Sequence, residues 1–590
     1  SDDATTSAAG TKGGPFGSQK YDEKFQWQNT NTLSYADSFG KHHLNVMLGN
    51  ELVFTQSRSL KAANNQFPDD NFGIYDLSLG SLPQKPESSF DETGLVSYFA
   101  RAFYNFDDRY LLTMTLRTDG SSKFAKENRF GWFPSASAAW RISEEEFMKP
   151  LQRVISSLKL RASYGQSGNN RIGNNRYSSI FESNWYANGS SEIPSLISKT
   201  LGNPGLKWET TVSANIGLDF GLFNNRISGT VEVYKNKTKD LLLTADVTPT
   251  TGYTKQTLNI GSVQSHGVEL TLNTVNIRTK NFMWTSNFNI SINKNKVKSL
   301  ATGAADEYML FKSGVGSYME DYIVRVGSST GLIYGYVNDG LYGVDDFDAT
   351  LDPETGNYTY ALKASVPFCA ITGAADKVQP GSPRFKDVDG KNGITADDRT
   401  VIGNANPKHF GGFNNTFTYK GFDLSIFMNW SYGNDVLNYQ KARLISTYQS
   451  NQNQSAALNG RFTYVDAGGN YVTEPGALRE LNKNATVHAV KTSGPESNIT
   501  VTQSDFVEDG SFLRINNVTL GYTFTGKWLK KAHISSLRLY ATVNNLYTFT
   551  NYSGFDPDVN KRPNGGLTPG VDWSAYPKTR SVVFGVNLNF

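Results

Sequence analysis

The sequence has almost no cysteine, no long apolar run and hardly any net charge. Its 590 residues include a single cysteine, Cys369, so no disulfide framework can form within the chain. No run of about eighteen apolar residues occurs, which excludes a membrane-spanning helix. The 57 basic and 54 acidic side chains nearly cancel, and this balance gives no reason to expect a nucleic-acid partner.

Catalytic and zinc-binding motifs are missing as well. No phosphate-binding P-loop is present, and the scattered carboxylates form no recognisable catalytic pair. The histidines include His42 and His43 beside one turn and His533 beside another, without the spacing of zinc ligands. We therefore expect no enzymatic activity and no resident cofactor.

Aromatic residues and glycine, in contrast, are abundant. The chain holds 36 Phe, 30 Tyr, 9 Trp and 54 Gly, a mixture that suits many strands and turns. The mean hydropathy is only -0.44. A membrane β-barrel is compatible with this value because its strands alternate apolar and polar residues, and its aromatic residues form girdles at the two membrane interfaces.

The last ten residues carry a strand pattern up to the end of the sequence. Apolar side chains occupy alternate positions, at Val582, Phe584, Val586, Leu588 and Phe590. Terminal segments of soluble proteins usually fray. The last strand of an outer-membrane barrel must instead close the cylinder and face lipid along one side. The pattern therefore indicates contact with membrane lipid.

The same alternation recurs in about fifteen segments, which we predict to be strands. They lie near 24–37, 42–57, 93–106, 109–120, 131–142, 158–167, 209–220, 227–234, 258–274, 284–293, 407–419, 422–430, 511–525, 537–544 and 582–590.

Short and long connections between these segments alternate without exception. The longest are 58–92, 168–207, 298–406, 436–510 and 551–577. Outer-membrane barrels have short periplasmic turns and long extracellular loops, so the alternation predicts an all-β, transmembrane antiparallel β-barrel. A soluble sandwich or propeller would explain the strands, but neither the loop asymmetry nor the terminal aromatic residue.

The direction of the last strand predicts the side of every loop. If the C-terminus is periplasmic, strand 24–37 runs inward and residues 1–23 belong to an extracellular loop. The largest familiar plugged barrels have about 22 strands, so 24–590 would supply the C-terminal fifteen or so. The remaining N-terminal strands and a plug would then lie outside this chain.

Four segments carry a recognisable pattern. They are Asn544 to Tyr552 followed by Gly554 to Pro557, Leu201 to Thr210, Asn259 to Gly261 with His266 to Leu270, and Val401 to Pro407. Together they resemble the SusC/RagA TonB-dependent transporters of Bacteroidota. The resemblance extends from about Phe25 to Phe590, in the order of the family.

The resemblance implies a 22-stranded outer-membrane barrel with an N-terminal plug. A TonB-ExbB-ExbD complex in the inner membrane would energise it, and a SusD-like surface lipoprotein would cap it. Such proteins import oligosaccharides or oligopeptides. The segment that engages TonB is not recognisable in this sequence. A passive porin, or a structural or secretion-associated barrel, remains an alternative function.

One loop has the spacing of a calcium site. Asp387, Asp389 and Asp398 take the first, third and twelfth positions of an EF-hand-like loop. Lys391 stands at the fifth position, where an oxygen ligand is expected, and the glycine is at the seventh instead of the sixth. The segment is therefore either a calcium loop or a solvated acidic turn.

Aromatic residues gather in the 168–207 connection, at Tyr177, Phe181, Trp185 and Tyr186. Such residues can stack on sugar rings, although aromatic residues of large loops more often pack the loop itself. We do not assign them as a binding site, and the residues that contact substrate cannot be named from the sequence.

Overall fold

The computed structural model describes residues 15–68, 75–189, 191–247, 249–253, 255–300, 308–314, 320–368, 378–391, 393–446, 453–489, 501–560 and 566–590. Strands dominate these residues. No helix among them is both long enough and apolar enough to cross a membrane. The chain divides into two compact units, unit 1 (Ser1–Lys149, Lys159–Ile216 and Asn236–Ser262) and unit 2 (Pro150–Leu158, Gly217–Lys235 and Val263–Phe590).

Within the described residues, fifteen strands form the path of the main antiparallel sheet, and β3 (Leu82–Pro83) pairs with β2 outside this path. The fifteen are β1 (Phe16–Phe39), β2 (His42–Asn65), β4 (Glu87–Phe106), β5 (Tyr110–Ser121), β6 (Phe130–Arg141), β7 (Ile155–Asn169), β10 (Glu209–Leu222), β11 (Ile227–Lys239), β14 (Ser262–Arg278), β15 (Phe282–Ser299), β24 (His409–Tyr419), β25 (Phe422–Tyr432), β28 (Phe512–Phe524), β29 (Ser536–Thr550) and β31 (Ser581–Asn589).

Each of these strands overlaps one predicted segment, so the number and positions of the strands are confirmed. The boundaries differ most in the first hairpin, where β1 begins at Phe16 instead of near residue 24 and β2 ends at Asn65 instead of near residue 57. Residues 16–23 have no continuous apolar face, and backbone pairing with residues 58–65 of β2 extends the strand through them. Residues 1–14 of the predicted loop, and Cys369, lie outside the described residues.

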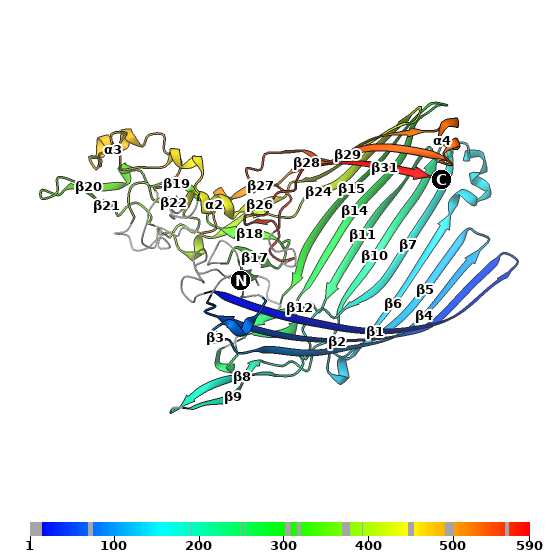
Figure 1. Ribbon diagram of the computed structural model, residues 1–590, viewed down its shortest axis with the longest axis horizontal. Coiled ribbons are helices and arrows are strands. Elements are labelled where there is room, and N and C mark those ends of the chain that lie inside the picture. The colour runs from blue at the N-terminus through cyan, green and yellow to red at the C-terminus, as the bar shows by residue number, and fades with distance from the viewer. Residues whose placement is uncertain are drawn as a thin grey trace. The chain divides into compact units, whose positions relative to one another are not determined.

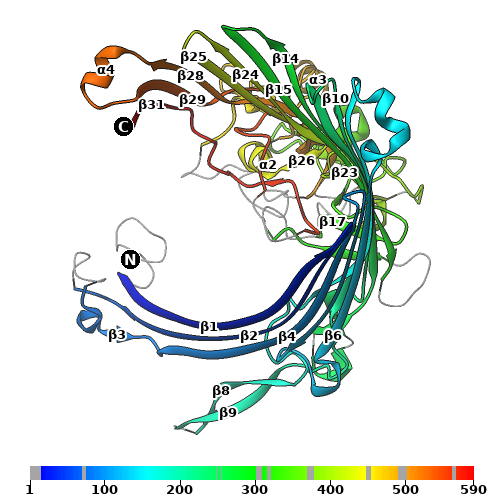
Figure 2. The same cartoon turned by 90° about the vertical axis from the view of Figure 1, so that its right-hand side faces the viewer.

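Unit 1 contains long antiparallel hairpins. β1 and β2 pair in one register from Phe16 with Asn65 to Phe39 with His42, and β4 pairs with the other edge of β2. These three strands lie side by side in both views (Figures 1 and 2). Each exceeds the roughly 9–11 residues that a tilted strand needs to cross a bilayer, so the hairpin extends beyond a membrane's hydrocarbon region.

In unit 2, β15, β24, β25, β28, β29 and β31 follow one another as antiparallel neighbours. The register shifts at two places, between Phe427 and Met428 and between Ile515 and Asn517. The last strand pairs with β29 from Ser536–Asn589 to Asn544–Ser581. Figure 2 shows the short helix α4 (Lys527–Lys531) in the turn between β28 and β29.

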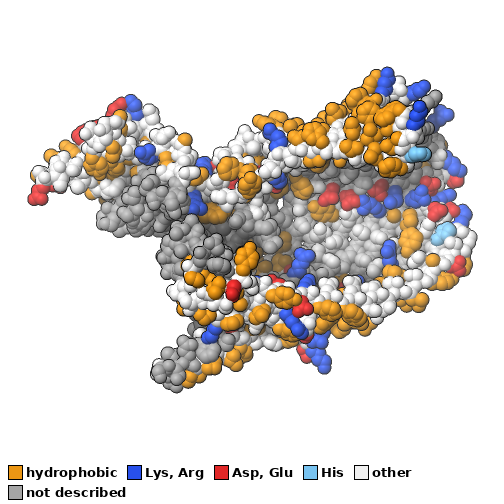
Figure 3. Space-filling view, viewed as in Figure 1, with side chains coloured by type: hydrophobic (Ala, Val, Ile, Leu, Met, Phe, Trp, Pro, Cys, Tyr) orange, Lys and Arg blue, Asp and Glu red, His pale blue; other side chains and the backbone are white. Residues whose placement is uncertain are grey.

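The terminal strands of unit 2 have one apolar and one polar face. On the apolar face, Leu539, Phe584 and Val586 are exposed, Phe584 by 80%. Hydrophobic side chains gather over the region of β28, β29 and β31 in the space-filling view (Figure 3). An exposed apolar band of this kind is what the lipid-facing side of a membrane strand requires.

Hydrogen bonds connect side chains on the polar face. Thr519 and Thr542 lie 2.9 Å apart, and Arg538 donates to Asp423 through Nε and Nη2 at 2.9 and 2.6 Å. The alternating pattern therefore separates a polar surface from an apolar one, as the sequence predicts.

Short turns form the short connections in the alternating pattern of short and long ones. Asp107 and Asp108 between β4 and β5, and Asn224 and Asn225 between β10 and β11, adopt positive φ angles of 52–57°. Asn and Asp tolerate this left-handed conformation better than other residues that have a side chain. The Gly40 turn between β1 and β2 uses a glycine for the same purpose.

The long connections contain further elements. In unit 1 they hold β8 (Ile180–Asn188), β9 (Ser191–Thr200), β12 (Leu242–Asp246) and β13 (Lys255–Asn259). In unit 2 they hold β16 (Tyr308–Phe311), β17 (Tyr322–Arg325), β18 (Leu332–Gly335), β19 (Asn338–Leu341), β20 (Phe347–Leu351), β21 (Tyr358–Leu362), β22 (Pro383–Phe385), β23 (Thr400–Asn404), β26 (Asp435–Asn438), α2 (Tyr439–Ser446), α3 (Pro475–Leu481), β27 (Val507–Asp509) and β30 (Val571–Asp572).

Candidate functional site

Three long connections of unit 2 fold together into one structure, which we call the loop assembly. It comprises the described parts of 300–408, 433–511 and 551–580. β26 of the second connection pairs antiparallel with β27 and parallel with β30 of the third. β18 pairs with β23 within the first. The loop assembly is therefore held by small sheets as well as by side chains.

A hydrophobic core lies inside the loop assembly. All three connections contribute buried residues to it, namely Tyr322, Ile333, Leu437, Tyr439, Ala442, Phe506 and Val571. Burying one large apolar side chain stabilises a fold by about 1.5–3 kcal/mol, so a shared cluster of this size offsets much of the entropy lost in ordering the connections. A second cluster around Tyr342, Phe462 and Leu478 joins the first two connections again.

A polar contact crosses the first of these cores. The buried Asp321 carboxylate accepts from the backbone N–H of Ser313 at 2.6 Å and from the Tyr439 hydroxyl at 2.9 Å. Tyr439 also lies 2.8 Å from the Thr502 hydroxyl. Burial raises the pKa of the Asp321 carboxyl above its ordinary value, and the hydrogen bonds offset this effect only in part. The contact ties the residue that precedes β17 to the first residue of α2.

A cavity of about 530 Å³ opens within the loop assembly. Its walls come from all three connections: Leu341 and Pro383 from the first, Lys441 and His488 from the second, and Phe555 from the third. This volume lies within the range of about 300–1,000 Å³ typical of small-molecule sites. Both apolar and polar side chains line it, so it resembles a binding cavity in both size and lining.

A buried histidine lies in the cavity wall. His488 is 7% exposed, and its Nδ1 lies 3.1 Å from the backbone carbonyl of Ala489. A carbonyl only accepts, so Nδ1 carries the proton and Nε2 is a lone-pair acceptor. Burial lowers the pKa of the imidazole, which keeps this neutral form at neutral pH. Nε2 has no hydrogen-bond partner among the described residues.

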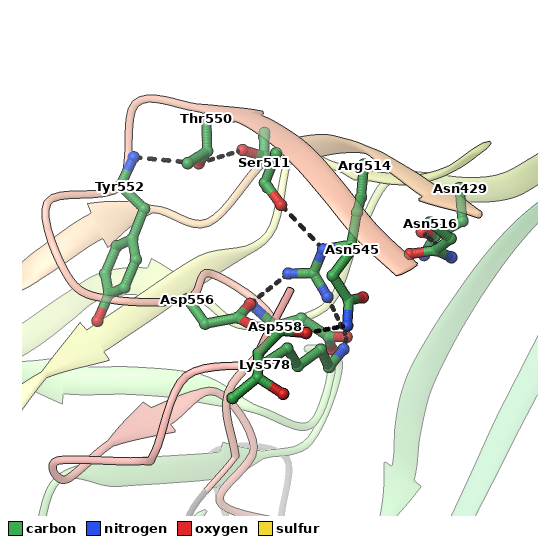
Figure 4. A network of polar contacts seen from close by, with 12 residues as sticks. Asn429, Ser511, Arg514, Asn516, Asn545, Thr550, Tyr552, Asp556, Asp558 and Lys578 are labelled. Carbon is green, nitrogen blue, oxygen red and sulfur yellow. Dashed lines mark hydrogen bonds and ion pairs between the residues drawn. The ribbon is translucent and has the colours of Figure 1, made fainter. Parts of the chain in front are cut away.

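The last connection is fastened to the sheet by a buried ion pair (Figure 4). Arg514 of β28 pairs through Nη2 with Asp556, and both side chains are less than a tenth exposed. The Arg514 Nε donates to the Thr548 hydroxyl of β29 at 3.0 Å. Asp558 lies 3.8 Å from Arg514 and also pairs with Lys578.

The predicted metal ligands come together in the structure. Asp387, Asp389 and Asp398 each place a carboxylate oxygen within 4.8 Å of the others. Lys391, at the position where a calcium loop needs an oxygen, places Nζ 2.8 Å from Asp389. This ammonium competes with a cation for the same carboxylate, which favours the acidic-turn interpretation. Calcium binding at these residues stays a prediction.

Backbone donors surround the third of these carboxylates. Asp398 is fully buried and accepts from the N–H groups of Val388 at 2.8 Å, Asp389 at 3.2 Å and Thr395 at 2.7 Å. Burial alone would raise the pKa of the Asp398 carboxyl, but the backbone donors outweigh it and hold the pKa below its ordinary value. The Asp398 carboxylate thus organises the turn through three backbone hydrogen bonds.

The other side chains singled out by the sequence do not form a site among the described residues. Phe181 and Tyr186 on the β8–β9 hairpin are more than half exposed, and the Trp185 side chain lies outside the described residues. His42 Nδ1 lies 2.7 Å from the Tyr104 hydroxyl. His43 Nδ1 lies 2.7 Å from the Ser38 hydroxyl.

The cavity residues could not be found from the sequence. His488, Gln440 and Phe555 belong to separate parts of the chain, and no spacing relates them. The one available signal was the length of the connections themselves, because long loops with their own structure are often functional.

Comparisons with known proteins agree with the strand pattern. Residues 1–546 match the family model described as TonB dependent receptor-like, beta-barrel. TonB-dependent receptor P3 of Formosa agariphila is 32% identical over 578 residues, which cover 96% of this chain and 53% of that protein. TonB-dependent receptor SusC of Bacteroides thetaiotaomicron is 30% identical over 516 residues, covering 84% and 44%. The chain spans about half the length of the curated relatives it matches.

A solved structure shows the same fold. The RagAB peptide importer in its "closed-closed" state is 25% identical, with a TM-score of 0.75, and the match covers 97% of this chain and 56% of that one. The predicted all-β, antiparallel transmembrane barrel class and the resemblance to SusC and RagA are both confirmed. The chain belongs to the TonB-dependent receptor-like β-barrel family, as a SusC- and RagA-like member.

Proposed function

We propose that the chain forms the barrel portion of an outer-membrane active importer of polar oligomers, either oligosaccharides or oligopeptides. The observation that carries this proposal is similarity along nearly the whole chain to TonB-dependent receptors, SusC among them, and to a peptide importer. Transport in the proposed mechanism draws on a TonB-ExbB-ExbD complex. The chain acts as a transporter and not as an enzyme.

The two faces of the terminal strands support this proposal. Leu539 and Phe584 suit contact with lipid, and the polar face around Arg538, Asp423 and Thr542 suits a water-filled interior. Hydroxyl, amide and charged groups on that face can hydrogen-bond a polar oligomer as it passes.

The structure of the loop assembly is suited to binding a partner protein on the cell surface. Its shared cores give the three connections a defined surface instead of separate mobile loops. We propose that a SusD-like lipoprotein docks on this surface and delivers the oligomer. One relative, the RagAB peptide importer, has been solved in "closed-closed" and "open-open" states, and an assembly with a lipoprotein lid would open and close in this way.

Uptake in the native bacterium tests the proposal. A strain lacking the gene is supplied with single oligosaccharides or oligopeptides as the carbon source, and uptake of a fluorescent oligomer is followed with and without a protonophore. We expect loss of growth on at least one oligomer, and uptake that the protonophore abolishes. Affinity purification of the tagged protein should also recover a lipoprotein. Protonophore-resistant uptake would instead indicate a passive porin.

A further inference from the structure

The cavity in the loop assembly contains two acceptors without partners. His488 Nε2 and Gln440 Oε1 are both buried and form no hydrogen bond among the described residues. Gln440 and His488 line the same cavity, although they lie 48 positions apart in the sequence. A buried polar atom without a partner destabilises a fold by about 1–3 kcal/mol, so such atoms need an explanation.

The unpaired atoms specify one kind of polar partner. The imidazole Nε2 is an acceptor because Nδ1 holds the ring proton against Ala489. The Gln440 oxygen is an acceptor by its nature. A ligand that satisfies both must bring hydrogen-bond donors, such as hydroxyl groups.

The charges of the wall favour a neutral ligand. Lys441 donates to the Asp505 backbone carbonyl at 2.9 Å and pairs with Glu508 at 3.2 Å, so its charge is already compensated. Asp505 adds one carboxylate to the lining. The cavity therefore offers neither an unpaired cation for an anionic ligand nor a concentrated negative charge for a cation.

The remaining lining favours a ligand with an apolar body. Leu341, Leu444, Ile445, Phe506 and Phe555 lie around the cavity, and Phe555 is 67% exposed. A pyranose ring has C–H groups on its faces and hydroxyl groups on its edge, and aromatic side chains stack on such faces. A peptide fits less well because each of its units brings a carbonyl acceptor that also needs a donor.

We propose that this cavity is a binding site for a neutral saccharide unit, whose hydroxyl groups donate to His488 and Gln440. The aromatic ring of Phe555 covers one face of the sugar at the cavity mouth. The site is defined by the loop assembly alone, so binding requires neither energisation nor transport.

Binding measurements on the purified full protein test the site. Maltotriose, cellotriose, xylotriose and laminaritriose serve as probes in saturation-transfer NMR and calorimetry, with tetra-alanine as the peptide probe. We expect at least one trisaccharide to bind. His488→Phe and Gln440→Leu should each weaken binding at least threefold, because each removes one acceptor. His533→Gln, at an exposed histidine far along the chain, should leave binding unchanged.

A second variant keeps the test decisive if His488→Phe does not fold. Ala457→Trp places an indole in the cavity lining from an exposed position and should abolish binding while the protein remains folded. Three results would overturn the proposal: no trisaccharide binds, binding survives Ala457→Trp, or tetra-alanine competes with the sugar for the site. Loss of import in cells with sugar binding intact would count against the proposed function alone.

Discussion

The buried Arg514–Asp556 pair allows a quantitative test of how the last long connection is held. We consider Arg514→Met, which keeps most of the side-chain volume but removes the guanidinium. Arg514 and Asp556 are only 3% and 7% exposed, so the substitution leaves a nearly buried carboxylate without its counter-ion. Breaking a buried ion pair in this way costs about 3–5 kcal/mol.

The quantity to measure is the free energy of local opening, because the Arg514–Asp556 pair holds one connection in place and not the whole barrel. A loss of about 3–5 kcal/mol corresponds to an increase of about 100- to 4,000-fold in the equilibrium constant for opening of the segment around Asp556. Hydrogen–deuterium exchange of peptides from 551–560, measured by mass spectrometry on the full protein, reports this constant. The rest of the sheet should exchange as in the unaltered protein.

A matched substitution separates burial from charge. Lys578 also pairs with an aspartate of this connection, Asp558, but both side chains are nearly half exposed. Exposed pairs contribute about 0–1 kcal/mol, so Lys578→Met should raise exchange less than about fivefold.

A second-site change tests the physical cause. Adding Asp556→Asn to Arg514→Met removes the uncompensated charge and should recover most of the protection. The reasoning is refuted if Arg514→Met and Lys578→Met raise exchange equally, or if Asp556→Asn restores nothing.

Three further predictions concern other parts of the chain. Asp398→Asn should loosen the 387–399 turn by about 1–3 kcal/mol. The pKa of Asp398 in the folded protein lies below its ordinary 3.8, so the unaltered turn should be stable above pH 3.8 and should open as the pH falls below it. The stability of the turn in the variant should not depend on pH in this range. Hydrogen–deuterium exchange, corrected for intrinsic rates, measures the opening of the turn in both proteins. Phe584→Lys, on the exposed apolar face of β31, should destabilise the folded barrel in lipid by about 2–4 kcal/mol on urea titration, while Asn587→Lys on the opposite face changes little. Gly421→Ala should lower stability by about 1 kcal/mol because φ is +96° in its turn, whereas Gly94→Ala meets open space and should be neutral in the same titration.

The strands of the main sheet could be predicted because their information is local. One side chain in two faces lipid, so the period-two pattern marks each strand without knowledge of its neighbours. The start of β1 was missed because residues 16–23 have no continuous apolar face, and their strand depends on pairing with β2.

The loop assembly could not be predicted because its contacts are distant in sequence. The Tyr322 hydroxyl donates to the carbonyl of Pro569, and Tyr439 reaches back to Asp321. The calcium-like spacing of Asp387 and Asp389 was visible because it lies within one short segment. The ion pair between Lys391 and Asp389 could not be predicted from the sequence, because it depends on a side-chain conformation.

The short turns also bear on how the sheet assembles. Left-handed residues such as Asp107 and Asn224 bring consecutive strands together over a few residues, whereas β15 and β24 are separated by the whole segment from Ser299 to His409. Closing a loop of that length costs about 3–4 kcal/mol more in chain entropy than closing a tight turn. Hairpins with tight turns should therefore form early in folding, with registers set locally. Pairing across the long connections should follow, once the loop assembly has drawn their ends together.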